Sequence, residues 1–232
     1  MNLKKILLIF PVALIVIYFC TGIFFDPKDV IYIKPFIVPS FIIYALVNNY
    51  NKLTLNYFLY VLFFYINEVL LLFWIESIIL FRIALIASFF CYLSLINLGY
   101  VSLKNKNLYI IPKGFTLFIL ILNCVFLASI LYILISAIGD IYLNIILIFN
   151  AIVAVILGVT AVLYLGKFTD RKSYYYFFGS FALIFNDIFA AVVTYFIDNP
   201  LLNTLDRLLH FASFVLIYLF IIKDKKKVEN SG

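Results

Sequence analysis

Charged residues are scarce in this sequence: they make up 12% of its 232 residues, whereas 67% are hydrophobic. An ordinary soluble domain is about one quarter charged and about half apolar. A soluble fold of this length has too little interior to bury so much apolar surface, so the composition excludes a typical soluble domain. Lipid is the solvent that suits this chain, and we expect an integral membrane protein.

Cysteine and histidine are also rare, with three copies and one copy. Cys20, Cys91 and Cys124 lie far apart inside apolar runs, which argues against a disulfide framework. Few ligands are left for a His/Cys metal site. The sequence also lacks a nucleophile elbow, a phosphate-binding loop, a zinc-protease motif and a dinucleotide-binding glycine pattern. It therefore indicates none of the enzyme classes that depend on those motifs.

Long apolar runs are what the chain does contain. A helix needs about 20 residues to cross a hydrocarbon core about 30 Å thick. Eight segments reach or approach this length, and we expect one all-α membrane domain, residues 1–232, with about eight transmembrane helices. The predicted spans are 6–25, 30–48, 57–75, 81–103, 115–137, 141–165, 174–197 and 204–222, followed by a basic tail at 223–232. The first run exceeds the length of a signal-peptide core, about 7–15 residues, so we expect it to remain as a membrane helix.

The distribution of Lys and Arg predicts the orientation. If the N-terminus is cytoplasmic, thirteen of the 17 basic residues lie on the inner side and four on the outer side. The four outer residues are Lys28, Lys34, Arg82 and Arg207. This bias predicts that both termini are cytoplasmic, and it suits a bacterial inner membrane. The net charge of +6 is then explained by topology, and no nucleic-acid partner is expected.

Two acidic residues fall at mid-depth in the predicted spans, where ionisable groups are costly and usually functional. Glu68 lies roughly 16 Å, and Asp187 roughly 20 Å, from the inner ends of their helices. Asn67 and Asn186 precede them and could bond to the acid or to a ligand. If the two carboxyl groups meet, they would share one proton. One group would then be a general acid and the other a general base, as acid/base hydrolysis requires. The alternatives are that both acids only link helices through hydrogen bonds, or that they conduct ions or protons.

Three further features are weaker candidates for a binding site. His210 in the last span could carry a proton or be an interfacial residue whose bonds are satisfied. Asn97 and Tyr100 are three residues apart and share a helix face. Lys34 could hold a phosphate or extend to the membrane surface.

The order of these motifs resembles the YhhN-like, or lysoplasmalogenase, family of small eight-span membrane proteins. The resemblance covers nearly the whole chain. Its residues are Lys34-Pro35, Asn67-Glu68, Asn97-x-x-Tyr100, then Gly179 in GSFALIFND, which ends at Asn186-Asp187, and finally His210. The chain departs from the family pattern at 67, 68, 97 and 186, where the family has Gly, Asp, His and Ser.

The resemblance implies hydrolysis of the vinyl-ether bond of lysoplasmalogens, which releases a fatty aldehyde. It makes Glu68 and Asp187 the catalytic acid and base, in an order left open, and a lysophospholipid the partner. Lys34, Asn67, Asn97, Tyr100, Asn186 and His210 are the substrate-binding candidates. No metal or cofactor is implied. A non-catalytic lipid-binding or scaffold protein, and a small transporter, are the alternatives.

Overall fold

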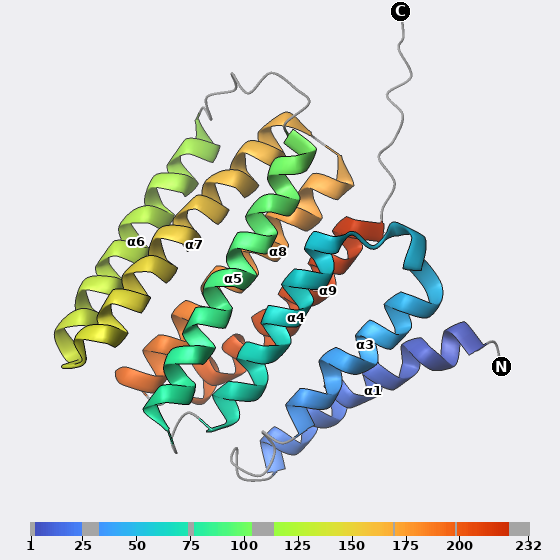
Figure 1. Cartoon of the computed structure of the whole chain (residues 1–232), viewed down its shortest axis with the longest axis horizontal. Coiled ribbons are helices and arrows are strands. Elements are labelled where there is room, and N and C mark those ends of the chain that lie inside the picture. Colours follow the sequence, from blue (N-terminus) through green and yellow to red (C-terminus); the bar gives the residue numbers. More distant parts are fainter. Residues whose placement is uncertain are drawn as a thin grey trace, which may run out of the picture. The chain divides into compact units, whose positions relative to one another are not determined.

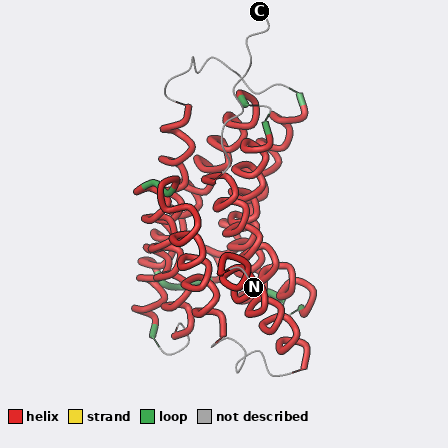
Figure 2. The backbone as a smooth tube through the Cα atoms, turned by 90° about the vertical axis from the view of Figure 1, so that its right-hand side faces the viewer, coloured by secondary structure: helices red, strands yellow, loops and turns green. Residues whose placement is uncertain are grey.

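The computed structural model describes residues 3–24, 33–73, 77–103, 114–168, 170–197 and 199–222. Every regular element in these ranges is a helix, as Figure 1 shows. Figure 2 shows the same helices joined by loops, with no strand in the described ranges. The predicted all-α class is therefore confirmed.

Five helical segments in the described ranges are long and apolar enough to cross a membrane. They are α4 (Leu55–Leu70) with its 3₁₀ extension η3 (Leu71–Phe73), α5 (Ile78–Leu103), α7 (Ile141–Lys167), α8 (Arg171–Tyr195) and α9 (Pro200–Ile222). These five segments support a multi-pass membrane protein. α5 begins at Ile78, three residues before the predicted start of its span at 81.

The other predicted spans also overlap helices: α1 (Leu3–Phe24), α3 (Lys34–Asn49) and α6 (Phe115–Ala137). The short 3₁₀ helix η2 (Tyr50–Lys52) follows α3. With 16 residues, α3 is shorter than the roughly 20 needed for a full crossing. The number of crossings therefore stays a prediction, as do the orientation and the tail at 223–232, which lies outside the described residues.

Polar side chains fix where several of the helices begin. Asp140 accepts hydrogen bonds from the backbone N–H groups of Tyr142 and Leu143, at 2.9 and 3.1 Å, and thereby caps α7. Asp170 caps α8 through the N–H of Ser173 at 2.8 Å. Asp and Asn are among the best N-cap residues because their oxygens satisfy the exposed N–H groups of the first turn.

The chain divides into two compact units, residues 1–91 and 92–232. In the first unit α1 packs on α3, and α3 packs on α4. Phe63 of α4 stacks on Phe90 of α5, with 5.2 Å between the ring centroids. Whether the two units form one membrane domain stays a prediction.

The second unit is built around α8, which packs along α9 and also contacts α6 and α7. Three rings from different helices form its aromatic centre: Tyr164 of α7, Tyr176 of α8 and Phe220 of α9. Their centroids are 4.9 to 5.4 Å apart. The Tyr176 hydroxyl also donates to the carbonyl oxygen of Leu95 on α5, at 2.9 Å. This bond and the ring contacts tie α5, α7 and α9 to α8.

Candidate functional site

Asp187, one of the two predicted mid-depth acids, is held by a tyrosine from another helix. The hydroxyl of Tyr92 on α5 donates to Oδ2 of Asp187 on α8, at 2.6 Å. This distance is in the range of hydrogen bonds from a hydroxyl to a carboxylate. Tyr92 is buried and Asp187 is half-buried. The bond therefore places a carboxyl group, with a fixed donor, between two apolar helices.

Asn186 supplies a second donor to the same carboxyl group. Its side-chain amide donates to Oδ1 of Asp187 at 3.2 Å, which agrees with the expectation that the asparagine could bond to the acid. The Asn186 side-chain oxygen is buried and has no hydrogen-bond partner among the described residues. A buried polar atom of this kind is unusual and calls for a water molecule or a ligand donor. The site thus offers an open acceptor beside the carboxylate.

His210 lies at the level of Asn186 in the same unit. Gly179 of α8 faces Ile217 of α9, since an added Cβ would be 2.9 Å from the Ile217 side chain. Tyr176 and Phe220 form the neighbouring contact, so the two helices run antiparallel. Because both helices rise 1.5 Å per residue, the same register brings Asn186 level with His210. His210 is buried, and its carbonyl oxygen accepts from Ser213 at 2.7 Å.

The packing of α5 on α8 depends on a glycine. A Cβ added at Gly99 would overlap the Tyr176 hydroxyl and ring. Glycine therefore lets the ring of Tyr176 reach the α5 backbone, where it bonds to Leu95. Leu95 is one helical turn from Tyr92, so this contact also fixes the position of the tyrosine that holds Asp187.

Glu68, the other predicted acid, belongs to the first unit. It is 1% exposed and continues the buried face of α4 that contains Tyr57, Tyr60 and Phe64. Asn67 beside it is half-buried, and its side-chain oxygen is buried without a hydrogen-bond partner among the described residues. Each acid is therefore accompanied by an open amide acceptor. The pairing of Glu68 with Asp187 stays a prediction.

The remaining binding candidates lie on α5 and α3. Asn97 and Tyr100 are exposed on α5. Successive helical residues turn by about 100°, so Asn97 lies on the opposite side of α5 from Gly99, which faces Tyr176. Lys34 is the half-buried first residue of α3, in the first unit. The role of these three residues in substrate binding stays a prediction.

The contact between Tyr92 and Asp187 is the part of the site that the sequence did not reveal. It is one of 18 tyrosines, and its partner is 95 positions away. One signal existed: the predicted spans put Tyr92 and Asp187 at similar depths, roughly 16 and 20 Å from the inner ends. Matching polar residues by depth would have placed Tyr92 among the candidate partners of Asp187.

Comparisons with protein-family models, with curated proteins and with solved structures found no match to this chain.

Proposed function

We propose that this chain is a membrane-embedded hydrolase of the vinyl-ether bond of lysoplasmalogen-type lysophospholipids. The observation that carries the proposal is the 2.6 Å bond between Tyr92 and Asp187 inside apolar helices. A carboxyl group at membrane depth is costly and is a candidate functional group by default. The resemblance of the motif order to the YhhN-like family supplies the reaction and the substrate class.

The hydrogen bonds suggest how the two acids divide the work. Tyr92 and Asn186 both donate to Asp187, so its carboxyl group is held in a fixed orientation. We therefore assign Asp187 as the general base that takes a proton from water. Glu68, buried on α4, is then the general acid.

The reaction balances with these two groups and one water molecule. Glu68 donates its proton to the alkene carbon that is not bonded to the ether oxygen, and the positive charge that develops on the other carbon is shared with that oxygen. Water adds to the carbon attached to that oxygen while Asp187 accepts its proton. The hemiacetal then breaks its C–O bond: Asp187 returns its proton to the glycerol oxygen, and the hydroxyl proton of the hemiacetal passes to Glu68, which restores both groups. The products are a fatty aldehyde and a glycerophospho-alcohol.

The proposal includes the membrane arrangement. Eight crossings with both ends in the cytoplasm put both acids near the midplane, where water access is limited and acid/base groups can be shielded. Helices in each of the eight predicted ranges, and the excess of thirteen basic residues over four, support it. A bacterial inner membrane fits this charge bias.

The test is release of fatty aldehyde from a 1-alkenyl lysophospholipid by the purified protein in detergent. The matching ester lysophospholipid serves as the substrate control. Glu68→Gln and Asp187→Asn should each lower turnover by about 100-fold or more, since general acid/base groups contribute about 10² to 10⁴. Asp170→Asn is the matched control because Asn caps a helix as well as Asp does.

Two outcomes would count against the hydrolase. A folded preparation that releases no aldehyde would remove the proposed activity. Turnover that survives both acid substitutions would remove the assigned roles of Glu68 and Asp187.

A further inference from the structure

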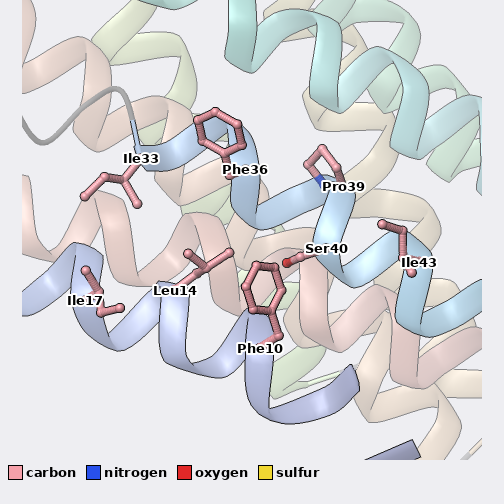
Figure 3. A pocket seen from close by; sticks show the side chains of 8 residues that line it. All are labelled: Phe10, Leu14, Ile17, Ile33, Phe36, Pro39, Ser40 and Ile43. Carbon is pink, nitrogen blue, oxygen red and sulfur yellow. The ribbon is translucent and has the colours of Figure 1, made fainter. Parts of the chain in front are cut away.

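The apolar groove between α1 and α3 in the first unit does not select a ligand by its chemistry. Figure 3 shows its lining, in which Ser40 is the one polar side chain. The Ser40 hydroxyl already donates to the carbonyl oxygen of Ile37, at 2.6 Å. A more informative polar atom lies in the second unit, on Asn186, where a buried oxygen lacks a hydrogen-bond partner among the described residues.

The side-chain oxygen of Asn186 needs a hydrogen-bond donor. The residue is only 7% exposed, and this oxygen is enclosed by protein atoms. Nearly all buried polar atoms in proteins are hydrogen-bonded, because leaving one unpaired costs free energy of folding. An enclosed oxygen leaves little room for a water molecule, so we expect a neighbouring side chain to be the donor.

Helix α9 lies opposite Asn186. Gly179 of α8 packs against Ile217 of α9, where an added Cβ would be 2.9 Å from the Ile217 side chain. Asn186 comes almost two full helical turns after Gly179, so it lies on the same face of α8. His210 comes almost two turns before Ile217 and likewise shares its face of α9. Because α8 and α9 run antiparallel and pack along each other, Asn186 and His210 face each other at the same level.

His210 is the side chain in this stretch of α9 that is best placed to donate. It is buried, and an imidazole ring carries at least one N–H in either protonation state. Ser213, one turn away, already donates its hydroxyl to the carbonyl oxygen of His210, at 2.7 Å. Asp206, one turn away in the other direction, donates nothing when it is ionised. Arg207 is half-buried and lies one turn away from the level of Asn186.

We propose that the imidazole of His210 donates to the side-chain oxygen of Asn186 and thereby positions the Asp187 carboxyl group. An asparagine amide has an accepting end and a donating end. With a donor at its oxygen, the amide directs its nitrogen to Asp187, as it does at 3.2 Å. If the amide turned over, its oxygen would face the carboxylate, and both groups can only accept. His210 is therefore a positioning residue that acts through Asn186.

The bond between Asn186 and Asp187 depends on this second contact because it is long. Its 3.2 Å lie at the upper end of the range for N–H···O bonds, about 2.7–3.2 Å. A bond of this length gives the amide only a weak preference for one orientation, so a donor at the opposite end decides it. The catalytic consequence rests on the proposed hydrolase function, whereas the bond from His210 to Asn186 does not.

The bond can be tested without turnover, because His210 is the only histidine of the chain. Nuclear magnetic resonance of the full chain in detergent, made with isotope-labelled histidine, therefore reports on one imidazole. Its bonded N–H proton should exchange slowly with water, and Asn186→Leu should shift its resonance and speed its exchange. Asn150→Leu is the matched control and should change neither, because the Asn150 amide donates within its own helix, to Ile146 at 3.1 Å.

A double-mutant cycle measures the coupling of the two side chains. His210→Leu and Asn186→Leu are made singly and together, and the unfolding equilibrium constant of each variant is measured in detergent. The two effects should depart from additivity by about fivefold, which is the contribution of one hydrogen bond. The same cycle with Arg207→Met in place of His210→Leu should be additive.

Aldehyde release tests the positioning role. His210→Leu should lower kcat by about tenfold and leave KM nearly unchanged, because it disturbs the orientation of Asp187 and removes no substrate contact. His210→Gln, whose amide can still donate, should restore most of the loss. When Asn186 is already Leu, His210→Leu should lower kcat no further, whereas a role in packing alone would cost the same in both backgrounds.

Several results would overturn the proposal. An imidazole N–H of the wild-type protein that exchanges as fast as that of an exposed histidine would exclude the bond, and this result needs no variant to fold. An unchanged resonance in Asn186→Leu, an additive cycle, or coupling to Arg207 instead would exclude it too. An unchanged kcat in His210→Leu would exclude the positioning role. If the wild-type protein releases no aldehyde, the hydrolase proposal fails, and the resonance and unfolding measurements still decide the bond.

Discussion

Tyr92 and Asp187 join α5 to α8 through a hydrogen bond of 2.6 Å, although 95 positions separate them in the chain. The bond occupies one oxygen of the carboxyl group, and Asn186 bonds to the other. The carboxyl group is therefore oriented by donors on both of its oxygens. The stability of the protein and the reactivity of this carboxyl group should both depend on the Tyr92 hydroxyl.

Tyr92→Phe should destabilise the protein and slow the proposed reaction. The substitution keeps the ring and removes one hydrogen bond to a charged group, a loss of about 1.5–3 kcal/mol. Unfolding in detergent, followed by circular dichroism, measures the first effect, and aldehyde release measures the second. Tyr132→Phe is the control, because Tyr132 is 77% exposed on α6. Equal stability of the two variants would mean that the Tyr92 hydroxyl contributes nothing.

Gly99→Ala should destabilise the packing of α5 on α8. The new methyl group would overlap the Tyr176 hydroxyl and ring, and overpacking of this kind costs about 1–3 kcal/mol. Thermal unfolding measures the loss. Gly139→Ala is the control, since an added Cβ there would have no described atom within 4 Å apart from its chain neighbours. If both variants unfold at the wild-type temperature, the close approach of Tyr176 to α5 is wrong.

Asp140→Ala should lower the free energy of unfolding by about 1 kcal/mol, because α7 loses the cap of its first turn. Asp140→Asn should have almost no effect, since the asparagine oxygen can accept the same bonds. Denaturant titration of the two variants distinguishes the cap from the charge. A loss of stability in Asp140→Asn equal to that in Asp140→Ala would assign the effect to the negative charge instead.

Reporter fusions test the eight-span topology. A fluorescent protein that folds only in the cytoplasm should be bright when fused after residue 108 or after the tail at 223–232. It should be dark after Gly139, and a phosphatase that is active only outside should give the opposite pattern. Five crossings, or any other odd number, would put the two ends of the chain on opposite sides, and the fusion at the tail would then reverse its signal relative to an N-terminal fusion.

The helices could be predicted from the sequence because each is a long apolar run that ends at polar residues. The predicted spans 115–137 and 141–165 match α6 and α7 within two residues, whereas α8 begins at Arg171, three residues before the predicted start at 174. The bond from Asn186 to Asp187 was also accessible, since neighbouring residues need no knowledge of the fold.

The contacts between helices could not be predicted in the same way. α5 is apolar on all sides, so its sequence does not reveal which face is buried. Asn97 and Tyr100 were selected because they share a helix face; the structure places both at exposed positions, and their role in binding stays a prediction. For the same reason the sequence did not reveal Tyr92, whose hydroxyl can bond to Asp187 only because this side of α5 faces α8. Which face of an apolar helix meets a neighbour depends on close packing, as at Gly99 and Tyr176, and this information is spread over distant segments.

The cap at Asp170 fixes where α8 begins, and thereby fixes the position of Asp187 along the helix axis. A helix that must start at its cap cannot slide along its axis, so the number of residues between Asp170 and Asp187 sets the height of the carboxyl group. One inserted residue would move the carboxyl group by about 1.5 Å and rotate it by about 100° away from Tyr92. The segment between Asp170 and Asp187 should therefore tolerate substitutions far better than insertions or deletions, which change its length.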